Sequence, residues 1–328
     1  MASGKQPDSI LLIKPSSLGD VVHALPIAEA LKTAYPESTL SWVVNAEWVE
    51  ILQGNPFIDQ VIVFPRKEFR GVSGMFRGWQ WMRGLRKVHP NLAIDLQGLF
   101  RSAWMAYNSK CGNLIGLSDA REGATLFYKN TIAVKQEWHA VDRYLAVLDF
   151  LEIPRPAAPR FFLPEGKRPD GFTINTPYLL LHPFSRGDGK SLSPEVTHAF
   201  CEKWRNTPIV LVGRTTEDYS FPSNTLNLLN KTTLTELIWL IRNSCFMVSV
   251  DSGPMHLCAG TGNRLLSIHT WSDPKLVGPY SQDSWVWRDG NIQTVAEFRT
   301  PSSSGGRAFI ENDLDKLIAW LSPQFPFL

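Results

Sequence analysis

The segment Lys14–His23 has the residue types of a general-base site at the end of a strand. Asp20 follows the small residue Gly19 and stands where a helix pattern begins, shortly after the apolar run Ile10–Ile13. A carboxylate there can remove a proton from an attacking hydroxyl, provided that burial or a late proton transfer offsets its weak basicity. An Asp in this place is equally a helix N-cap. His23, one turn further on, either orients the carboxylate or the acceptor, or is a core histidine.

A second junction, after the apolar run Phe246–Val250, has the residue types of an anion site. Asp251 directly follows the strand, and Pro254 is a favoured first helical residue. The backbone N–H groups of residues 252–255 are then expected at a helix start, which suits a diphosphate. His256 on the same turn can add a donor. An ordinary capped helix in a Rossmann-like domain is the alternative interpretation.

The loop His182–Lys190 follows another apolar run and carries Ser185, Arg186 and Lys190. Cations at a strand end can neutralise the charge that grows on a departing diphosphate. A solvated polar loop is the alternative. Glu217, after a further strand, can accept hydrogen bonds from ribose hydroxyls.

The stretch 66–87 is basic and aromatic. It holds seven Lys or Arg residues against one acid, with Phe76, Trp79 and Trp81 interleaved. Such a segment can lie on an anionic membrane face or bind an acidic acceptor. It can also be a solvated helix whose Trp residues face the core. Its cations are Arg66, Lys67, Arg70, Arg77, Arg83, Arg86 and Lys87.

Short apolar runs that alternate with helical patterns must position these groups. They predict an α/β protein with two doubly wound, Rossmann-like domains of parallel strands, whose ligands bind at the carboxyl edges of the sheets. The proline-rich segment 151–171 is the predicted linker between the two domains. The predicted domains are residues 1–160 and 161–309. The helix 310–328 is expected to pack back on the first domain. The predicted strands are 10–13, 41–44, 61–64, 92–96, 114–117, 178–181, 209–212, 246–250 and 265–268, and the helices are 20–34, 47–52, 194–204, 234–242, 254–259 and 314–321.

Composition narrows the class of protein. The chain has 328 residues, 44% of them hydrophobic, and a net charge of +2, which gives no overall signature of nucleic-acid binding. Four cysteines without a CxxC pair favour a reduced, cytosolic setting. We see neither a signal peptide nor an apolar run long enough to cross a bilayer, so any membrane contact is expected at the surface. No P-loop, GxGxxG or HExxH motif occurs.

Several motifs in order resemble glycosyltransferase family 9, the ADP-heptose:lipopolysaccharide heptosyltransferases. The resemblance covers nearly the whole chain. Besides Lys14–His23, it rests on Asp95–Ala103, Ala120–Glu122 with Leu126–Tyr128, His139–Arg143, the Lys190 loop and Asp251–His256.

This resemblance implies a GT-B fold with a central cleft, an acceptor domain followed by a donor domain, and inverting transfer of heptose from ADP-heptose to a Kdo sugar of lipid A–Kdo. The setting it implies is the cytoplasmic face of the bacterial inner membrane, with no cofactor, no metal and no nucleic acid. By the same resemblance, Asp20 matches the base, Lys190 the phosphate-binding lysine, Glu217 a ribose contact and Thr232 an adenine contact. The donor set implied is Ser185, Arg186, Lys190, Glu217, Thr232, Asp251, Ser252, Gly253 and His256. The candidate acceptor set is Ser17, Gly19, His23, Arg66, Lys67, Gln97, Arg101 and Arg121.

The chain departs from the family pattern in two places. Phe184–Ser185 stands where the family has a threonine-rich stretch, and Ser252 stands where Thr is common. Three other functions share this architecture: a related transferase with another acceptor, a nucleotide-sugar epimerase or hydrolase, and a non-catalytic nucleotide-sugar or lipid-binding protein. An epimerase or hydrolase would turn over donor without acceptor.

Overall fold

The protein is described by a computed structural model that covers residues 6–69, 71–187, 189–216, 220–298 and 306–325. The chain divides into two compact units, Met1–Pro164 and Glu165–Leu328. The division falls in the segment expected to be the linker, four residues beyond the expected 160/161 boundary. No helix or strand occurs between Phe150 and Leu179, all of which is described. No helix in the described part of the chain is both long and apolar enough to span a bilayer.

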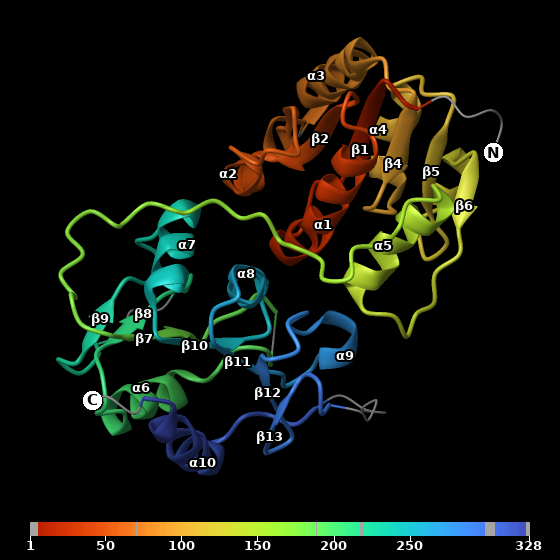
Figure 1. Cartoon of the computed structure of the whole chain (residues 1–328). Coiled ribbons are helices and arrows are strands. Elements are labelled where there is room, and N and C mark those ends of the chain that lie inside the picture. Colours follow the sequence, from red (N-terminus) through yellow and green to blue (C-terminus); the bar gives the residue numbers. More distant parts are fainter. Residues whose placement is uncertain (1–5, 70, 188, 217–219, 299–305, 326–328) are drawn as a thin grey trace. The chain divides into compact units, whose positions relative to one another are not determined.

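The first unit is built on a sheet of six parallel strands in the order β3-β2-β1-β4-β5-β6 (Figure 1). This order reverses direction between β1 and β4, as in doubly wound folds, so the segments that follow these two strands leave toward opposite faces of the sheet. The register pairs Ile13 with Val43 on one side and with Asp95 on the other. The strands are β1 (Ser9–Ile13), β2 (Thr39–Asn45), β3 (Gln60–Phe64), β4 (Leu92–Asp95), β5 (Leu114–Leu117) and β6 (Asn130–Ile132).

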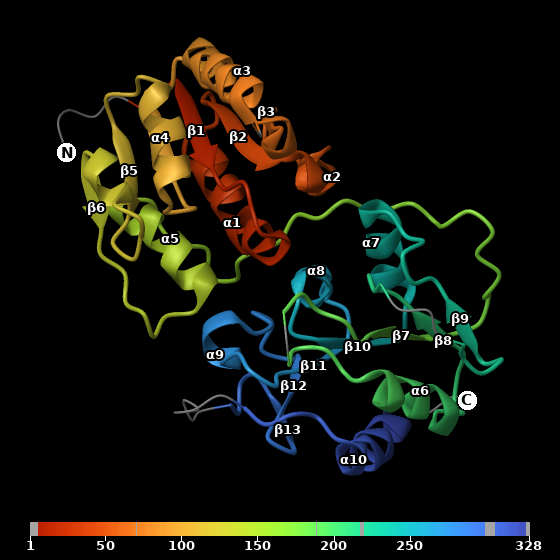
Figure 2. The same ribbon diagram turned by 180° about the vertical axis from the view of Figure 1, so that it is seen from behind.

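Helices cover both faces of this sheet (Figures 1 and 2). Right-handed crossovers that run in opposite directions from β1 and β4 place α1 on one face and α3 and α4 on the other. The core beneath α3 and α4 includes Met105, Leu85 and Phe64. The helices are α1 (Leu18–Ala34), α2 (Val49–Leu52), α3 (Gly71–Gly84), α4 (Phe100–Asn108) and α5 (Ala140–Phe150).

The second unit repeats this strand order with one addition. Its sheet runs β13-β12-β11-β10-β7-β8-β9, and every pairing is parallel except that of β13 with β12. The switch point lies between β7 and β10. The strands are β7 (Leu179–His182), β8 (Ile209–Leu211), β9 (Thr225–Asn227), β10 (Phe246–Val250), β11 (Leu265–Ile268), β12 (Trp285–Arg288) and β13 (Asn291–Thr294).

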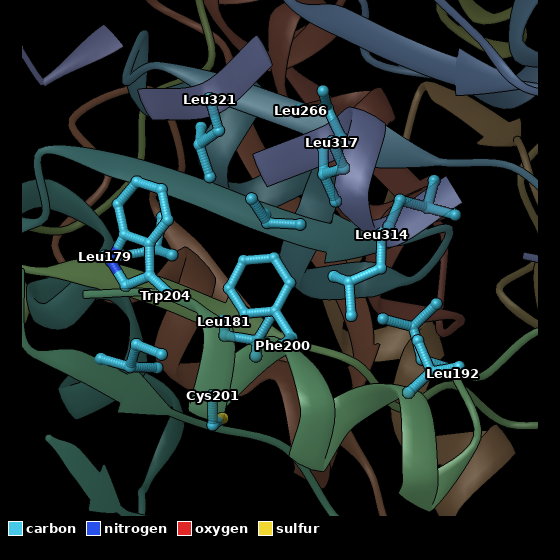
Figure 3. Packing of buried hydrophobic residues seen from close by; sticks show 14 of the residues in the cluster. Leu179, Leu181, Leu192, Phe200, Cys201, Trp204, Leu266, Leu314, Leu317 and Leu321 are labelled. Atoms are coloured by element: carbon cyan, nitrogen blue, oxygen red, sulfur yellow. The ribbon is translucent and has the colours of Figure 1, made fainter. Parts of the chain in front are cut away.

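The C-terminal helix α10 (Glu311–Leu321) belongs to the second unit, which corrects the expectation that it packs on the first. Leu314, Leu317 and Leu321 are fully buried against Phe200 and Trp204 (Figure 3). An amphipathic pattern shows that a helix has a buried face but does not say which core that face joins. The other helices of this unit are α6 (Pro194–Lys203), α7 (Leu234–Asn243), α8 (Gly253–Thr261) and α9 (Pro274–Val277).

Candidate active site

Asp20 lies in the first turn of α1, and donors meet both of its carboxylate oxygens. The backbone N–H and the hydroxyl of Ser17 donate to Oδ2 over 2.9 and 2.7 Å. The Tyr144 hydroxyl donates to Oδ1 over 3.2 Å, and the Lys14 ammonium lies 3.7 Å from the same oxygen. Ser17 is the N-cap and Asp20 the third helical residue, so the N-cap interpretation of Asp20 is corrected. The carboxylate instead belongs to a capping box.

These contacts keep the Asp20 carboxylate charged. Burial opposes its ionisation, but Lys14 and the donors of Ser17 and Tyr144 outweigh burial and hold the pKa of Asp20 below its ordinary value. The side chain is still 38% exposed. Asp20 is therefore ionised at neutral pH and accessible from solvent, and its low pKa makes it a weak base.

Lys14 is a buried cation that links Asp20 to the neighbouring strand β4. It is 3% exposed, and burial lowers its pKa although Asp20 and Asp95 favour its charged form. Its ammonium donates to the Leu96 carbonyl over 3.2 Å and lies 4.9 Å from the centre of the Tyr144 ring. Three elements, β1, β4 and α5, thus converge on the carboxylate.

Asp95 at the end of β4 is a second carboxylate, which the sequence interpretation left without a role. It is fully buried, and burial raises its pKa despite hydrogen bonds from Tyr128, Ser102, Gly98 and Gln97. The Tyr128 and Ser102 hydroxyls donate to Oδ2 over 2.8 and 2.9 Å. The N–H groups of Gln97 and Gly98 donate to Oδ1 over 2.9 and 3.2 Å. Asp95 therefore fixes the turn after β4.

We predict that Asp95→Asn destabilises the first unit by about 2–3 kcal/mol, because an amide presents N–H groups to one pair of buried donors. The free energy of unfolding in urea measures this change. The matched control is Asp149→Asn in the same unit, whose carboxylate is 56% exposed and pairs with Arg155. That control should stay within about 0.5 kcal/mol of wild type. Equal losses in the two variants would contradict a structural role for Asp95.

Gln97 and His23 have structural contacts. The Gln97 side-chain oxygen accepts the Ser16 N–H over 3.1 Å, which connects the turn after β4 to the loop before α1. His23 is 4% exposed, and its ring meets that of His139 edge to face at 5.2 Å. This burial favours the core interpretation of His23 over an acceptor contact. Gly19 is also buried, inside the first turn of α1.

The basic acceptor candidates follow the carboxyl ends of other strands in the same sheet. Arg66 and Lys67 come after β3, and both are exposed; Lys67 pairs with Glu47 over 2.9 Å. Arg121 follows β5, is exposed, and donates its backbone N–H to the Gly98 carbonyl over 2.7 Å. Arg101 is exposed on the first turn of α4. Parallel strands bring these residues to one edge of the sheet, the edge that carries Asp20.

In the second unit, Lys190 and Asp251 meet at the ends of β7 and β10. The Lys190 ammonium lies 3.7 Å from Asp251 Oδ2 and 4.8 Å from the centre of the Trp271 ring. The Ser185 hydroxyl donates to the Asp251 carbonyl over 3.0 Å. The Thr270 hydroxyl donates to the Gly189 carbonyl over 2.7 Å, so the turn after β11 holds the Lys190 loop. Trp271, which is 65% exposed, was not among the expected site residues.

Asp251 is ionised in this cluster. Burial opposes its charge, but His269, His256 and other neighbours outweigh burial and lower its pKa. Burial also lowers the pKa of His269 and of His182 to about 4, so both imidazoles are neutral near pH 7. The Lys190 ammonium, 3.7 Å from Oδ2, is the cation that forms an ion pair with Asp251.

The start of α8 offers fewer donors than expected. Ser252 is the N-cap and Gly253 the first helical residue, as an anion site requires. Pro254 has no N–H, and the Met255 N–H donates to the Ser252 carbonyl over 3.1 Å. The expected group of four N–H donors is thus reduced to those of Ser252 and Gly253. His256 is 7% exposed and lies close enough to Asp251 for its interaction to lower the pKa of that carboxylate.

A pocket of about 490 Å³ lies beside this cluster, in the size range of small-molecule sites. It is lined by Phe184, Ser185, Arg186, Ser191, Leu192, Pro194, Arg214, Thr215 and Thr216. Asn230 anchors the loop after β8, because its amide exchanges hydrogen bonds with the Thr215 backbone over 2.7 and 3.1 Å. Thr232 precedes the N-cap of α7 and does not line this pocket. Glu217 lies outside the described residues.

The first unit has a carboxylate at the edge of its sheet, and the second has a cation there that can bind an anion. Two Rossmann-like units of this kind define the GT-B class predicted from the sequence. Residues 79–307 match the profile of glycosyltransferase family 9 (heptosyltransferase), and the chain belongs to that family. It is therefore a glycosyltransferase.

Individual relatives agree with this assignment. The chain is 24% identical to the lipopolysaccharide core heptosyltransferase OpsX of Haemophilus influenzae, over 90% of this chain and 89% of OpsX. It is also 24% identical to lipopolysaccharide heptosyltransferase 1 of Escherichia coli O18:K1:H7, over 94% of this chain and 98% of that one. The solved structure of the E. coli heptosyltransferase WaaC with ADP has a TM-score of 0.69 at 22% identity, covering 97% of this chain and 98% of WaaC. This last likeness shows the fold.

Proposed function

We propose that this enzyme transfers heptose from ADP-heptose to a Kdo sugar of a lipid A–Kdo acceptor, in synthesis of the lipopolysaccharide inner core. The observation that carries the proposal is the ionised, accessible Asp20 in one unit together with the Lys190–Asp251 cluster in the other. The names of the relatives support heptose and lipopolysaccharide, and the WaaC structure with ADP supports the nucleotide.

The proposed reaction is a single displacement. The acceptor oxygen attacks the anomeric carbon, its proton passes to Asp20, and the bond to the ADP oxygen breaks, which inverts the anomeric centre. Because the pKa of Asp20 is low, the proton moves late, once the attacking hydroxyl has been acidified by bond formation. Comparing the anomeric configuration of donor and product by NMR tests this step; retention would exclude it.

The leaving ADP is held in this proposal by the second unit. Lys190 exchanges its pairing with Asp251 for the diphosphate, and the start of α8 adds the N–H groups of Ser252 and Gly253. The pocket beside Arg186 has room for the nucleoside. These groups place positive charge where the leaving group develops negative charge, so we propose that transfer needs no metal. Loss of activity in EDTA that returns with added Mg²⁺ would contradict that part.

We further propose that the enzyme works on the cytoplasmic face of the inner membrane as a peripheral protein, because its acceptor is anchored there by acyl chains.

A hydrolase or epimerase would consume ADP-heptose alone. We therefore expect ADP release to depend on acceptor, with the rate in its absence at least about 100-fold lower, since water is a poorly positioned nucleophile. A coupled assay of ADP release, run with and without a Kdo-bearing acceptor, measures this ratio. Equal rates of ADP release with and without the acceptor would contradict heptosyl transfer to it.

Tyr144 is expected to tune the base. Its hydroxyl donates to Asp20 and lowers the pKa of that carboxylate, so Tyr144→Phe should raise the pKa. Activity needs ionised Asp20 and is lost as pH falls through its folded pKa; a higher pKa therefore moves the acid limb of kcat/KM to higher pH. We expect less than about a tenfold change in the plateau rate. An acid limb that stays in place or moves to lower pH would contradict this role for Tyr144.

A further inference from the structure

Helix α4 turns its aromatic side chains outward. Phe100, Trp104 and Tyr107 recur at i, i+4 and i+7 and are 50, 38 and 47% exposed, whereas Ala103 and Met105 between them are buried. An amphipathic helix of a globular protein normally buries its large apolar face. Here Ala103 and Met105 face the sheet, and the three rings face outward.

The exposed rings form one ordered stack. Phe100 and Trp104 are stacked with an interplanar angle of 6°, and Trp104 and Tyr107 with one of 23°. Phe127 meets all three rings, with centroid distances of 5.5–5.7 Å. Leu126 beside it is 88% exposed. The surface is thus held in shape by its own packing and does not depend on a partner for order.

Helix α3, which adjoins α4 on the same face of the sheet, also exposes aromatic rings (Figure 2). Phe76 and Trp79 are stacked and are 59 and 47% exposed, and the Arg83 guanidinium lies 4.5 Å from the centre of the Trp79 ring. Trp81 instead packs into the core against Phe64, with its indole N–H donating to a β3 carbonyl. Trp81 thus faces the core, as one interpretation of the stretch 66–87 expects, whereas Phe76 and Trp79 are exposed.

The charge of this region is mainly positive. Between residues 69 and 118 the sequence has seven Lys or Arg residues and one acid, Asp95, which is fully buried. Among the described residues Arg77, Arg83 and Lys110 form no ion pair, and the Lys110 ammonium lies 5.0 Å from the centre of the Tyr107 ring. Glu122, which accepts the Phe100 N–H over 3.2 Å, is an acid at its edge.

We propose that this surface, made of Phe76, Trp79, Phe100, Trp104, Tyr107 and Leu126 with their flanking cations, docks the enzyme on an anionic lipid surface. Trp and Tyr rings favour the boundary between headgroups and acyl chains, and Lys and Arg favour an anionic leaflet. Rings stacked on one another leave fewer free faces for nucleobases, which argues for lipid over single-stranded nucleic acid. The inference rests on the proposed function, since a lipid-linked acceptor is what requires docking.

Vesicle flotation of the full chain tests the proposal. We expect binding to vesicles of phosphatidylcholine mixed with phosphatidylglycerol, weakened at high salt, and little binding to phosphatidylcholine alone. The double variant Trp104→Ala/Lys110→Gln should bind the vesicles at least about tenfold more weakly. Loss of the cation alone weakens binding by about fivefold, and loss of the interfacial ring weakens it further. Circular dichroism confirms that the variant is folded.

The first unit offers a matched control. Lys135 and Trp138 form a similar cation–ring pair, 5.9 Å apart, outside this surface. Trp138→Ala/Lys135→Gln should bind within about twofold of wild type, as expected for a change away from the contact. Equal losses in the two double variants, or binding by wild type to RNA or another protein but not to vesicles, would overturn the proposal.

Transfer to a deacylated, water-soluble Kdo acceptor separates this inference from the proposed function. The Trp104→Ala/Lys110→Gln variant should match wild type on that acceptor and lose activity only on vesicle-borne acceptor. Vesicle binding that needs Trp104 and Lys110, in an enzyme that transfers no heptose, would refute the function and leave the docking surface standing. Heptose transfer by an enzyme that does not bind vesicles would refute the docking surface and leave the proposed function standing.

Discussion

Replacing Asp20 with Asn is expected to lower the rate of heptosyl transfer by about 10²–10⁴-fold, because an amide cannot take the proton of the attacking hydroxyl. The fold should survive. The amide oxygen can still accept from Ser17, but buried Lys14 loses a counter-charge, so we expect the free energy of unfolding to fall by about 1–3 kcal/mol. Single-turnover transfer and urea unfolding measure the two effects on the same preparation.

Asp142→Asn is the matched control for Asp20→Asn. Asp142 is also an acid in the first turn of a helix in the first unit, α5. Its loss removes a favourable charge at a helix start without touching the proposed base. We expect transfer within about twofold of wild type. If Asp20→Asn also kept more than a tenth of wild-type activity while folded, the carboxylate would act as a capping group and not as the base.

Replacing Lys190 with Ala is expected to lower kcat by about 10²–10³-fold, because the leaving diphosphate loses a preorganised cation. The KM for donor should rise as well, since the ground-state diphosphate also contacts this charge. Removing the ammonium leaves the carboxylate of Asp251, 12% exposed, without its ion-pair partner. A carboxylate facing the diphosphate would repel it, which adds to the loss. Steady-state kinetics with varied ADP-heptose separate the two parameters.

Lys203→Ala is the control for Lys190→Ala. Lys203 also pairs with an aspartate of the second unit, Asp315, at 2.8 Å, and it is 38% exposed. Pairs of this kind contribute about 0–1 kcal/mol to stability, so this variant should keep its kcat. A Lys190→Ala enzyme within threefold of wild type in kcat and in donor KM would show that another group holds the diphosphate.

Local patterns made the strand–helix junctions predictable. Each places a polar residue directly after a buried strand, and the carboxyl ends of parallel strands share an edge whatever the sequence between them. Asp20 and Asp251 could therefore be placed at sheet edges from the sequence, and β10 and β11 begin and end at the predicted residues. The strands β6, β9, β12 and β13 escaped prediction. β6, β9 and β13 are edge strands without a fully buried apolar run, and β12 is only four residues long and ends in Arg288.

Long-range partners could not be predicted from local patterns. Tyr144 reaches Asp20 across 124 residues, and only the packing of α5 on α1 brings the two together. Asp95 did carry a signal, a lone acid in an apolar strand, which marks a buried and hydrogen-bonded carboxylate. Trp271 carried none, because a single Trp in a loop has no periodicity. These residues modify the expected site without displacing its two main groups.

The mass of a Kdo-bearing lipid A acceptor, before and after incubation with ADP-heptose and enzyme, tests the proposed reaction most directly. With wild-type enzyme, we expect the mass of the acceptor to increase by one heptosyl residue. We expect no increase when the donor or the enzyme is omitted, or when Asp20→Asn replaces the wild-type enzyme. An acceptor of unchanged mass in tubes where ADP-heptose has been consumed would contradict heptosyl transfer and show that the two sites serve another reaction.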